Sequence, residues 1–205
     1  MRLLPKTQLI HTGPVDHADW NYRPGLAFVM RRRFALVLSL LPNRSHRLLE
    51  IGFGSGVFMP ELARRCDELY GIDVHERVAD VQAALEASGV LAVLSQQSAT
   101  KIEFDDAYFD SIIAISALEF VDNIQEAAGE LARVLRIGGR LVAVMPGKSA
   151  LLDFMLRVTT GEDAKRDYGD RRERVIPELE KYFRVLRTKS FSPVYTAYEL
   201  TPKHG

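Results

Sequence analysis

The feature that most constrains this chain is a glycine-rich turn between an apolar run and a segment with helical character. Residues 48–51, Leu-Leu-Glu-Ile, form a short apolar run of the kind that a strand buried on both faces shows. Three glycines follow at alternate positions, Gly52, Gly54 and Gly56, and residues 57–66 then have the pattern of a helix. Such a turn brings backbone N–H groups close to a ligand, because glycine has no Cβ in the way, and a helix N-terminus favours negative charge. The sequence therefore predicts a nucleotide-type site.

The spacing of the glycines leaves two kinds of ligand open. A dinucleotide fingerprint reads G-x-G-x-x-G, and its turn holds a pyrophosphate. Here the spacing is G-x-G-x-G, and Val57 stands where that fingerprint has its last glycine. Glu50 comes immediately before the turn, where a carboxylate suits a ligand with an ammonium group and disfavours a pyrophosphate. An ammonium-bearing nucleoside is favoured, with an NAD-type dinucleotide as the alternative.

Residues 50–56 resemble the first motif, E/D-x-G-x-G-x-G, of the class I S-adenosylmethionine (SAM) methyltransferases. SAM carries an amino group, a carboxylate and a sulfonium but no phosphate, so it suits Glu50 and the glycine amides. Asp73 ends a second short strand about twenty residues beyond the turn, the separation at which a Rossmann-like unit places a carboxylate on ribose hydroxyls. SAM and NAD both contain that ribose, so Asp73 indicates a nucleoside without distinguishing them.

Later stretches extend the resemblance over residues 47–144. Residues 96–110 are similar to G-D-A-x-x-L-P-F-x-D-x-x-F-D, and residues 118–121 are similar to L-E-H-V. Residues 133–141 are similar to R-V-L-x-P-G-G-x-L, a block that an NAD-binding half does not require. The serine in the first stretch stands where an acid usually meets the adenine amino group, and its hydroxyl still accepts one hydrogen bond. The sequence departs from these patterns at Ser98, Glu103, Phe120 and Ile137.

The resemblance implies a set of cofactor contacts and a lid formed by the N-terminal segment. An aromatic residue in that lid can face the sulfonium through a cation–π contact, and Tyr22 is the candidate. The expected cofactor-binding residues are Glu50, Gly52, Phe53, Gly54, Gly56, Asp73, Val74, Ser98, Ala99, Ser116 and Tyr22.

Strand and helix patterns alternate along the chain and predict an α/β fold. We expect a doubly wound, mostly parallel, seven-stranded Rossmann-like sheet with an antiparallel last strand. A single class I methyltransferase domain would cover residues 1–205. It would consist of an N-terminal lid segment and helix (1–46), a SAM-binding core (47–145), and substrate-side helices with a final strand pair (146–205). Within the last part, residues 150–158 have an apolar helix pattern and a charged loop follows them.

Composition excludes several classes of function. The 27 basic and 27 acidic residues cancel, so no overall field argues for nucleic acid or an anionic membrane. The single cysteine, Cys66, cannot form an internal disulfide, and neither a signal peptide nor a membrane-length apolar run is present. No histidine, cysteine or carboxylate cluster has metal-ligand spacing. We expect a soluble cytoplasmic protein, monomeric or homodimeric, without a metal, a nucleic acid partner or a membrane span.

The resemblance implies SAM-dependent methyl transfer to a small-molecule acceptor, as in the group that includes quinone-ring methyltransferases. The protein would contribute mainly alignment of the nucleophile with the methyl group. Glu119 and His17 are candidate bases, but Glu119 also suits the start of a helix and His17 also suits a solvated surface. The alternatives are a non-catalytic SAM-fold partner subunit and an NAD-dependent oxidoreductase.

Three consecutive arginines, Arg31 to Arg33, lie within a helix pattern that begins at Leu26 and ends before Pro42. Long arginine stems commonly lie along apolar surface while the guanidinium groups stay in water. The triplet therefore indicates either a solvated helix face or a site for an anionic substrate or partner.

Overall fold

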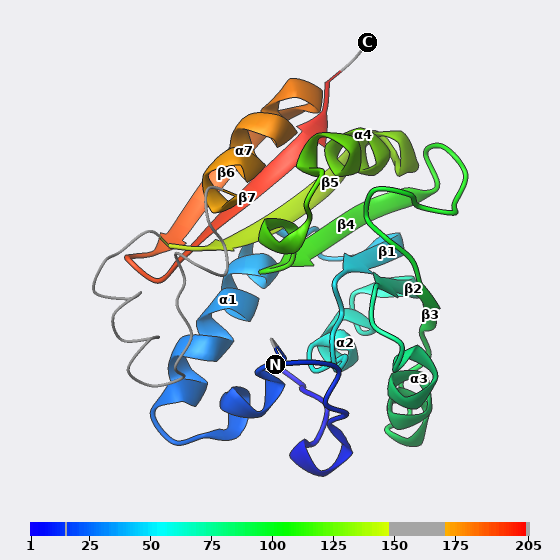
Figure 1. Ribbon diagram of the computed structural model, residues 1–205, viewed down its shortest axis with the longest axis vertical. Coiled ribbons are helices and arrows are strands. Elements are labelled where there is room, and N and C mark those ends of the chain that lie inside the picture. The colour runs from blue at the N-terminus through cyan, green and yellow to red at the C-terminus, as the bar shows by residue number, and fades with distance from the viewer. Residues whose placement is uncertain (15, 148–170, 204–205) are drawn as a thin grey trace.

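A seven-stranded sheet forms the centre of the molecule (Figure 1). The structure is a computed structural model that describes residues 1–14, 16–147 and 171–203. The strand order is β3-β2-β1-β4-β5-β7-β6, in which β1 to β5 pair in parallel and β7 runs antiparallel to both β5 and β6. The predicted fold class is confirmed. The strands are β1 (Ser45–Ile51), β2 (Cys66–Asp73), β3 (Val93–Gln96), β4 (Phe109–Ile115), β5 (Leu135–Pro146), β6 (Phe183–Phe191) and β7 (Tyr195–Pro202).

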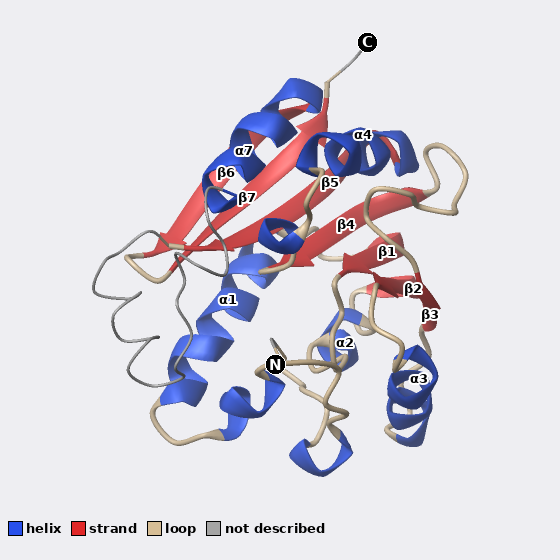
Figure 2. Ribbon diagram, viewed as in Figure 1, coloured by secondary structure: helices blue, strands red, loops and turns tan. Residues whose placement is uncertain are grey.

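Helices cover both faces of the sheet (Figure 2). One face carries α1 (Leu26–Leu40), α2 (Met59–Leu62) and α3 (Val78–Ala87), and the other carries α4 (Ile124–Val134) and α7 (Arg171–Tyr182). Within the described ranges, no helix is long and apolar enough to cross a membrane. Three short 3-10 helices complete the described elements: η1 (Lys6–Gln8), η2 (Ala18–Tyr22) and η3 (Leu118–Phe120).

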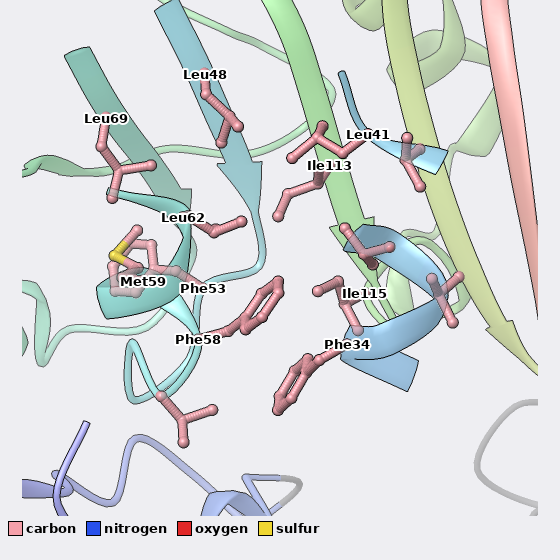
Figure 3. Close-up of a cluster of buried hydrophobic side chains, with 14 of the residues drawn as sticks. Phe34, Leu41, Leu48, Phe53, Phe58, Met59, Leu62, Leu69, Ile113 and Ile115 are labelled. Carbon is pink, nitrogen blue, oxygen red and sulfur yellow. The ribbon is translucent and has the colours of Figure 1, made fainter. Parts of the chain in front are cut away.

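Two hydrophobic cores lie on opposite sides of the sheet because successive strand residues point to opposite faces. Leu48 belongs to the core beneath α1 and α2, whereas Leu49 belongs to the core beneath α4 and α7. In the first core, the ring of Phe34 from α1 stacks on the ring of Phe58, with centroids 4.3 Å apart (Figure 3). This stack joins α1 to the segment that follows the glycine turn.

One element boundary differs from the sequence-based expectation. The helix expected over residues 57–66 is reduced to α2, and Cys66 instead begins β2. The cause is sheet register: Cys66 pairs with Ser45, whose N–H donates to the carbonyl of Arg65. Within β5, Gly138 has a φ of 76° and the pairing with β4 shifts register between Leu135 and Arg140. The helix expected over residues 150–158 lies outside the described residues.

Arg133, from the R-V-L block, holds the segment before β4 against α4. Its guanidinium donates to both carboxylate oxygens of Glu130, at 2.7 and 2.8 Å. It also donates to the carbonyls of Phe104 and Ile102 and to the carboxylate of Asp106. One planar group with five N–H donors is needed to reach all these acceptors.

We expect Arg133→Lys to lower the free energy of unfolding by about 1–3 kcal/mol, because an ammonium cannot reproduce this fork of hydrogen bonds. Arg136→Lys is the control, since Arg136 makes a single exposed ion pair with Asp110, worth roughly 0.5 kcal/mol. Urea denaturation measures both changes. Equal losses in the two variants would contradict the role given to Arg133.

Candidate functional site

A cavity of about 740 Å³ opens at the carboxyl ends of the parallel strands. Ligands in open α/β sheets bind at this edge. The ends of β1, β2 and β4 supply its floor, and residues 12–14, residues 16–18 and α1 supply further walls. Most of the residues that the sequence predicted for a cofactor site line it: Glu50, Gly52, Phe53, Gly54, Asp73, Val74, Ser98, Ala99 and Ser116.

The glycines of the turn have different physical roles. Gly52 has a φ of 70°, and a Cβ there would lie 2.6 Å from the Cβ of Ala117, so no side chain fits. Gly56 has a φ of 68°, and its Cβ would lie 3.1 Å from Val81 of α3. Gly56 is absent from the described cavity lining. The structure therefore does not bring Gly56 to the cavity as a cofactor contact; it permits close packing of α3 instead.

Glu50 is a buried carboxyl group aimed into this cavity from the end of β1. Its side chain is 4% exposed, and its Oε2 atom has no hydrogen-bond partner among the described residues. Burial raises the pKa of Glu50 to about 8, the charge of Asp73 raises it further, and the charge of Arg33 lowers it. A cationic group bound beside Glu50 would stabilise the ionised form. This orphaned oxygen fits the ammonium group of an amino-acid nucleoside.

Two residues at the end of β2 hold the peptide groups around Gly54. Asp73 accepts a hydrogen bond from the Gly54 N–H at 2.8 Å through one oxygen and from the Val74 N–H at 2.7 Å through the other. The Nε2 atom of His75 lies 3.1 Å from the Gly54 carbonyl, while its Nδ1 accepts from the Arg77 N–H. His75 therefore carries its proton on Nε2. The sequence analysis missed His75, although its position two residues beyond Asp73 was a usable signal.

Ser98 and Ser116 line the cavity from two other strand ends. The Ser98 hydroxyl accepts from the Thr100 N–H at 3.2 Å and lies 2.8 Å from the Thr100 hydroxyl, so a local turn uses part of its capacity. Ser116 has a φ of 52°, a left-handed conformation that is rare for a residue with a side chain. Its N–H donates to Val144 at 2.8 Å. Such strained residues concentrate at functional sites.

The N-terminal segment closes one side of the cavity. Asp16 organises it by accepting hydrogen bonds from the N–H and hydroxyl of Thr12 and from the N–H of Ala18. His17 lines the cavity and stacks on Trp20, with ring centroids 4.2 Å apart. The candidate base His17 is therefore close to any ligand bound there.

Two predicted site residues are not brought to the cavity as the structure describes it. The hydroxyl of Tyr22 donates to the carbonyl of Leu4, and Tyr22 is not among the described lining residues. Glu119 is 0% exposed and is not among the described lining residues, whereas its neighbour Phe120 is. Burial raises the pKa of Glu119 to about 7, and the charges of Arg172 and Arg33 lower it. Glu119 is therefore a fully buried residue outside the described lining.

We expect the free energy of unfolding to fall as pH rises from about 4.5 to about 8. The Glu50 carboxyl is neutral in the folded chain below about 8 but ionises near 4.5 when unfolded. The unfolded state then binds fewer protons, and the slope approaches roughly 1.4 kcal/mol per pH unit for one group. Glu50→Gln should make the slope shallower and leave the part due to Glu119. Denaturant titrations at several pH values measure how the free energy of unfolding depends on pH. An unaltered slope in the variant would refute the raised pKa assigned to Glu50.

Comparisons with known proteins identify the family. Residues 49–143 match the model of a methyltransferase domain family. The chain is 28% identical to a demethylmenaquinone methyltransferase of Roseiflexus castenholzii over 177 residues, covering 79% of this chain and 74% of that protein. It is 35% identical to a phosphatidylethanolamine N-methyltransferase of Cereibacter sphaeroides over 104 residues. That match covers 49% of this chain and 51% of the relative, so it spans about half of the relative's length.

The fold agrees with these matches. The crystal structure of the N-methyltransferase NodS from Bradyrhizobium japonicum, in complex with S-adenosylhomocysteine, superposes with a TM-score of 0.65 at 18% identity. The superposition covers 93% of this chain and 95% of that one. An identity this low supports the fold alone, while the matched segment contains the glycine turn, Asp73 and the R-V-L block. Residues 49–143 of this chain therefore form a methyltransferase domain.

Proposed function

We propose that this protein transfers the methyl group of SAM to a small-molecule acceptor. The observation that carries the proposal is the buried, unpartnered Glu50 oxygen beside the glycine turn. SAM supplies a methyl group on a sulfonium, which a nucleophile displaces in line. Glu50 would bind the ammonium group, Asp73 the ribose hydroxyls, and Ser98 with the Ala99 backbone the adenine. The main catalytic contribution is then alignment of the two reactants.

The walls of the cavity favour an acceptor with an apolar ring. Phe34, Phe58, Ile115, Phe120 and Val121 line it, and aromatic walls bind planar apolar groups well. Two relatives named for quinone methylation also match most of the chain, covering 79% and 80% of it. We therefore propose a quinol-like or similarly apolar small molecule.

His17 is the better-placed candidate for a base, because it lines the cavity. A base is required only if the acceptor loses a proton early in the reaction, as a phenol would. Glu119 is fully buried and is not among the described lining residues, so it is the weaker candidate. We also propose a cytoplasmic setting, for which the free, buried Cys66 is the support. The single-domain division of residues 1–205 and a monomeric or homodimeric state remain predictions.

Calorimetry combined with a turnover assay tests the function. The protein should bind SAM and S-adenosylhomocysteine and should not bind NAD. It should also transfer labelled methyl from SAM to at least one member of a panel of phenols, quinols and amines. Binding of NAD alone would contradict the proposal. Binding of SAM without transfer to any member of the panel would favour a non-catalytic partner subunit.

Asp73→Ala should lower the affinity for SAM by roughly tenfold or more, about 1.4 kcal/mol. The variant removes the ribose acceptor and also releases the Gly54 N–H that Asp73 holds. Asp67→Ala is the matched control, because Asp67 lies at the opposite end of β2, where it pairs with Arg44. Titration calorimetry measures both. Full affinity in a folded Asp73 variant would exclude this role.

A further inference from the structure

The arginine triplet of α1 does not act as one charged face. Successive residues of a helix point about 100° apart, so the three side chains reach different surroundings. Arg31 donates to the backbone carbonyl of Asn21, and Arg32 lies 4.6 Å from the centre of the exposed Phe28 ring. Arg33 lines the cavity. The two alternatives considered for the triplet therefore apply to different residues.

Arg33 forms no direct ion pair with another described residue, although its charge acts on the buried carboxyl groups of Glu50 and Glu119. Its Nε atom is buried and has no hydrogen-bond partner among the described residues. Its guanidinium carbon lies 4.9 Å from the centre of the Phe34 ring, which itself stacks on Phe58. Among the described residues that line the cavity, Arg33 is the only lysine or arginine. The ring contact offsets part of the cost of burying the guanidinium, but a buried N–H without an acceptor costs free energy that a ligand oxygen would recover.

Arg33 and Glu50 form a pair of complementary groups in one cavity. Both line it, each has a buried polar atom without a partner in the described chain, and the charge of Arg33 acts on Glu50. The Nε atom of Arg33 and the Oε2 atom of Glu50 do not hydrogen-bond to each other, since both lack a partner in the described chain. A ligand that satisfies both would carry a negative and a positive group. An α-amino acid has a carboxylate and an ammonium on the same carbon.

We propose that Arg33 binds the carboxylate at the amino-acid end of the cofactor, while Glu50 binds its ammonium. This inference rests on the proposed function, because it takes the cofactor to be SAM. It assigns Arg33 to cofactor affinity rather than to recognition of the acceptor. Arg33 and Glu50 would then hold the amino-acid end of the cofactor, while Asp73 holds its ribose. Guanidinium–carboxylate hydrogen bonds are among the stronger ones in proteins.

Ligands that lack parts of the amino-acid end test the proposal by titration calorimetry on the full chain. S-Adenosylhomocysteine contains the whole end, and 5′-methylthioadenosine contains none of it. We expect Arg33→Met to lower the affinity for S-adenosylhomocysteine by roughly tenfold or more, with the affinity for 5′-methylthioadenosine unchanged. Arg33→Lys should recover part of the loss. Arg32→Met is the matched control and should bind S-adenosylhomocysteine as the wild type does.

Several outcomes would overturn the inference. Arg33→Met could bind S-adenosylhomocysteine at full affinity, or could weaken both ligands equally. The wild-type protein offers a second test, because it should bind SAM more tightly than decarboxylated SAM. Equal affinities would refute the carboxylate contact and would leave the proposed function standing. Failure of the wild type to bind SAM, S-adenosylhomocysteine and 5′-methylthioadenosine would instead overturn the proposed function together with this inference.

Discussion

The site depends on one carboxyl group that the fold buries without a partner. Glu50 lies at the end of β1, between strands β2 and β4, and its outer oxygen is left without a hydrogen bond in the described chain. Such burial disfavours the charged form, so the group stays neutral until a cation arrives. The glycine turn that follows keeps side chains away from this oxygen. Binding of an ammonium group therefore satisfies an atom that folding alone leaves unsatisfied.

The second strand both shapes the turn and sets the charge around it. Parallel pairing with β1 carries Asp73 and His75 to the turn, where they hold the N–H and the carbonyl of Gly54. The negative charge of Asp73 also adds to the effect of burial on the pKa of Glu50. Arg33, on α1, acts in the opposite direction. In the proposed complex, Glu50 and Asp73 would face the ammonium and hydroxyl groups of the cofactor, and Arg33 would face its carboxylate.

Much of this arrangement could be predicted from sequence because it is local. Alternating apolar runs and helix patterns indicated the sheet, and the spacing from Gly54 to Asp73 indicated that both lie at the same edge. Features set by register or by side-chain direction could not be predicted in this way. Cys66 pairs with Ser45 and so shortens the helix after the turn, Tyr22 turns toward Leu4, and the triplet gives no sign that Arg33 alone reaches the cavity. Glu119 follows a strand end as expected, yet it is fully buried and is not among the described lining residues.

Proton release on cofactor binding tests the role of Glu50 most directly. Calorimetry of S-adenosylhomocysteine binding at pH 7, in buffers with different ionisation enthalpies, counts the protons exchanged. A carboxyl group that is neutral in the empty cavity and ionised beside the ammonium should release close to one proton per site, and Glu50→Gln should abolish that release. Binding without proton release in the wild type, or an equal release in the variant, would contradict the account.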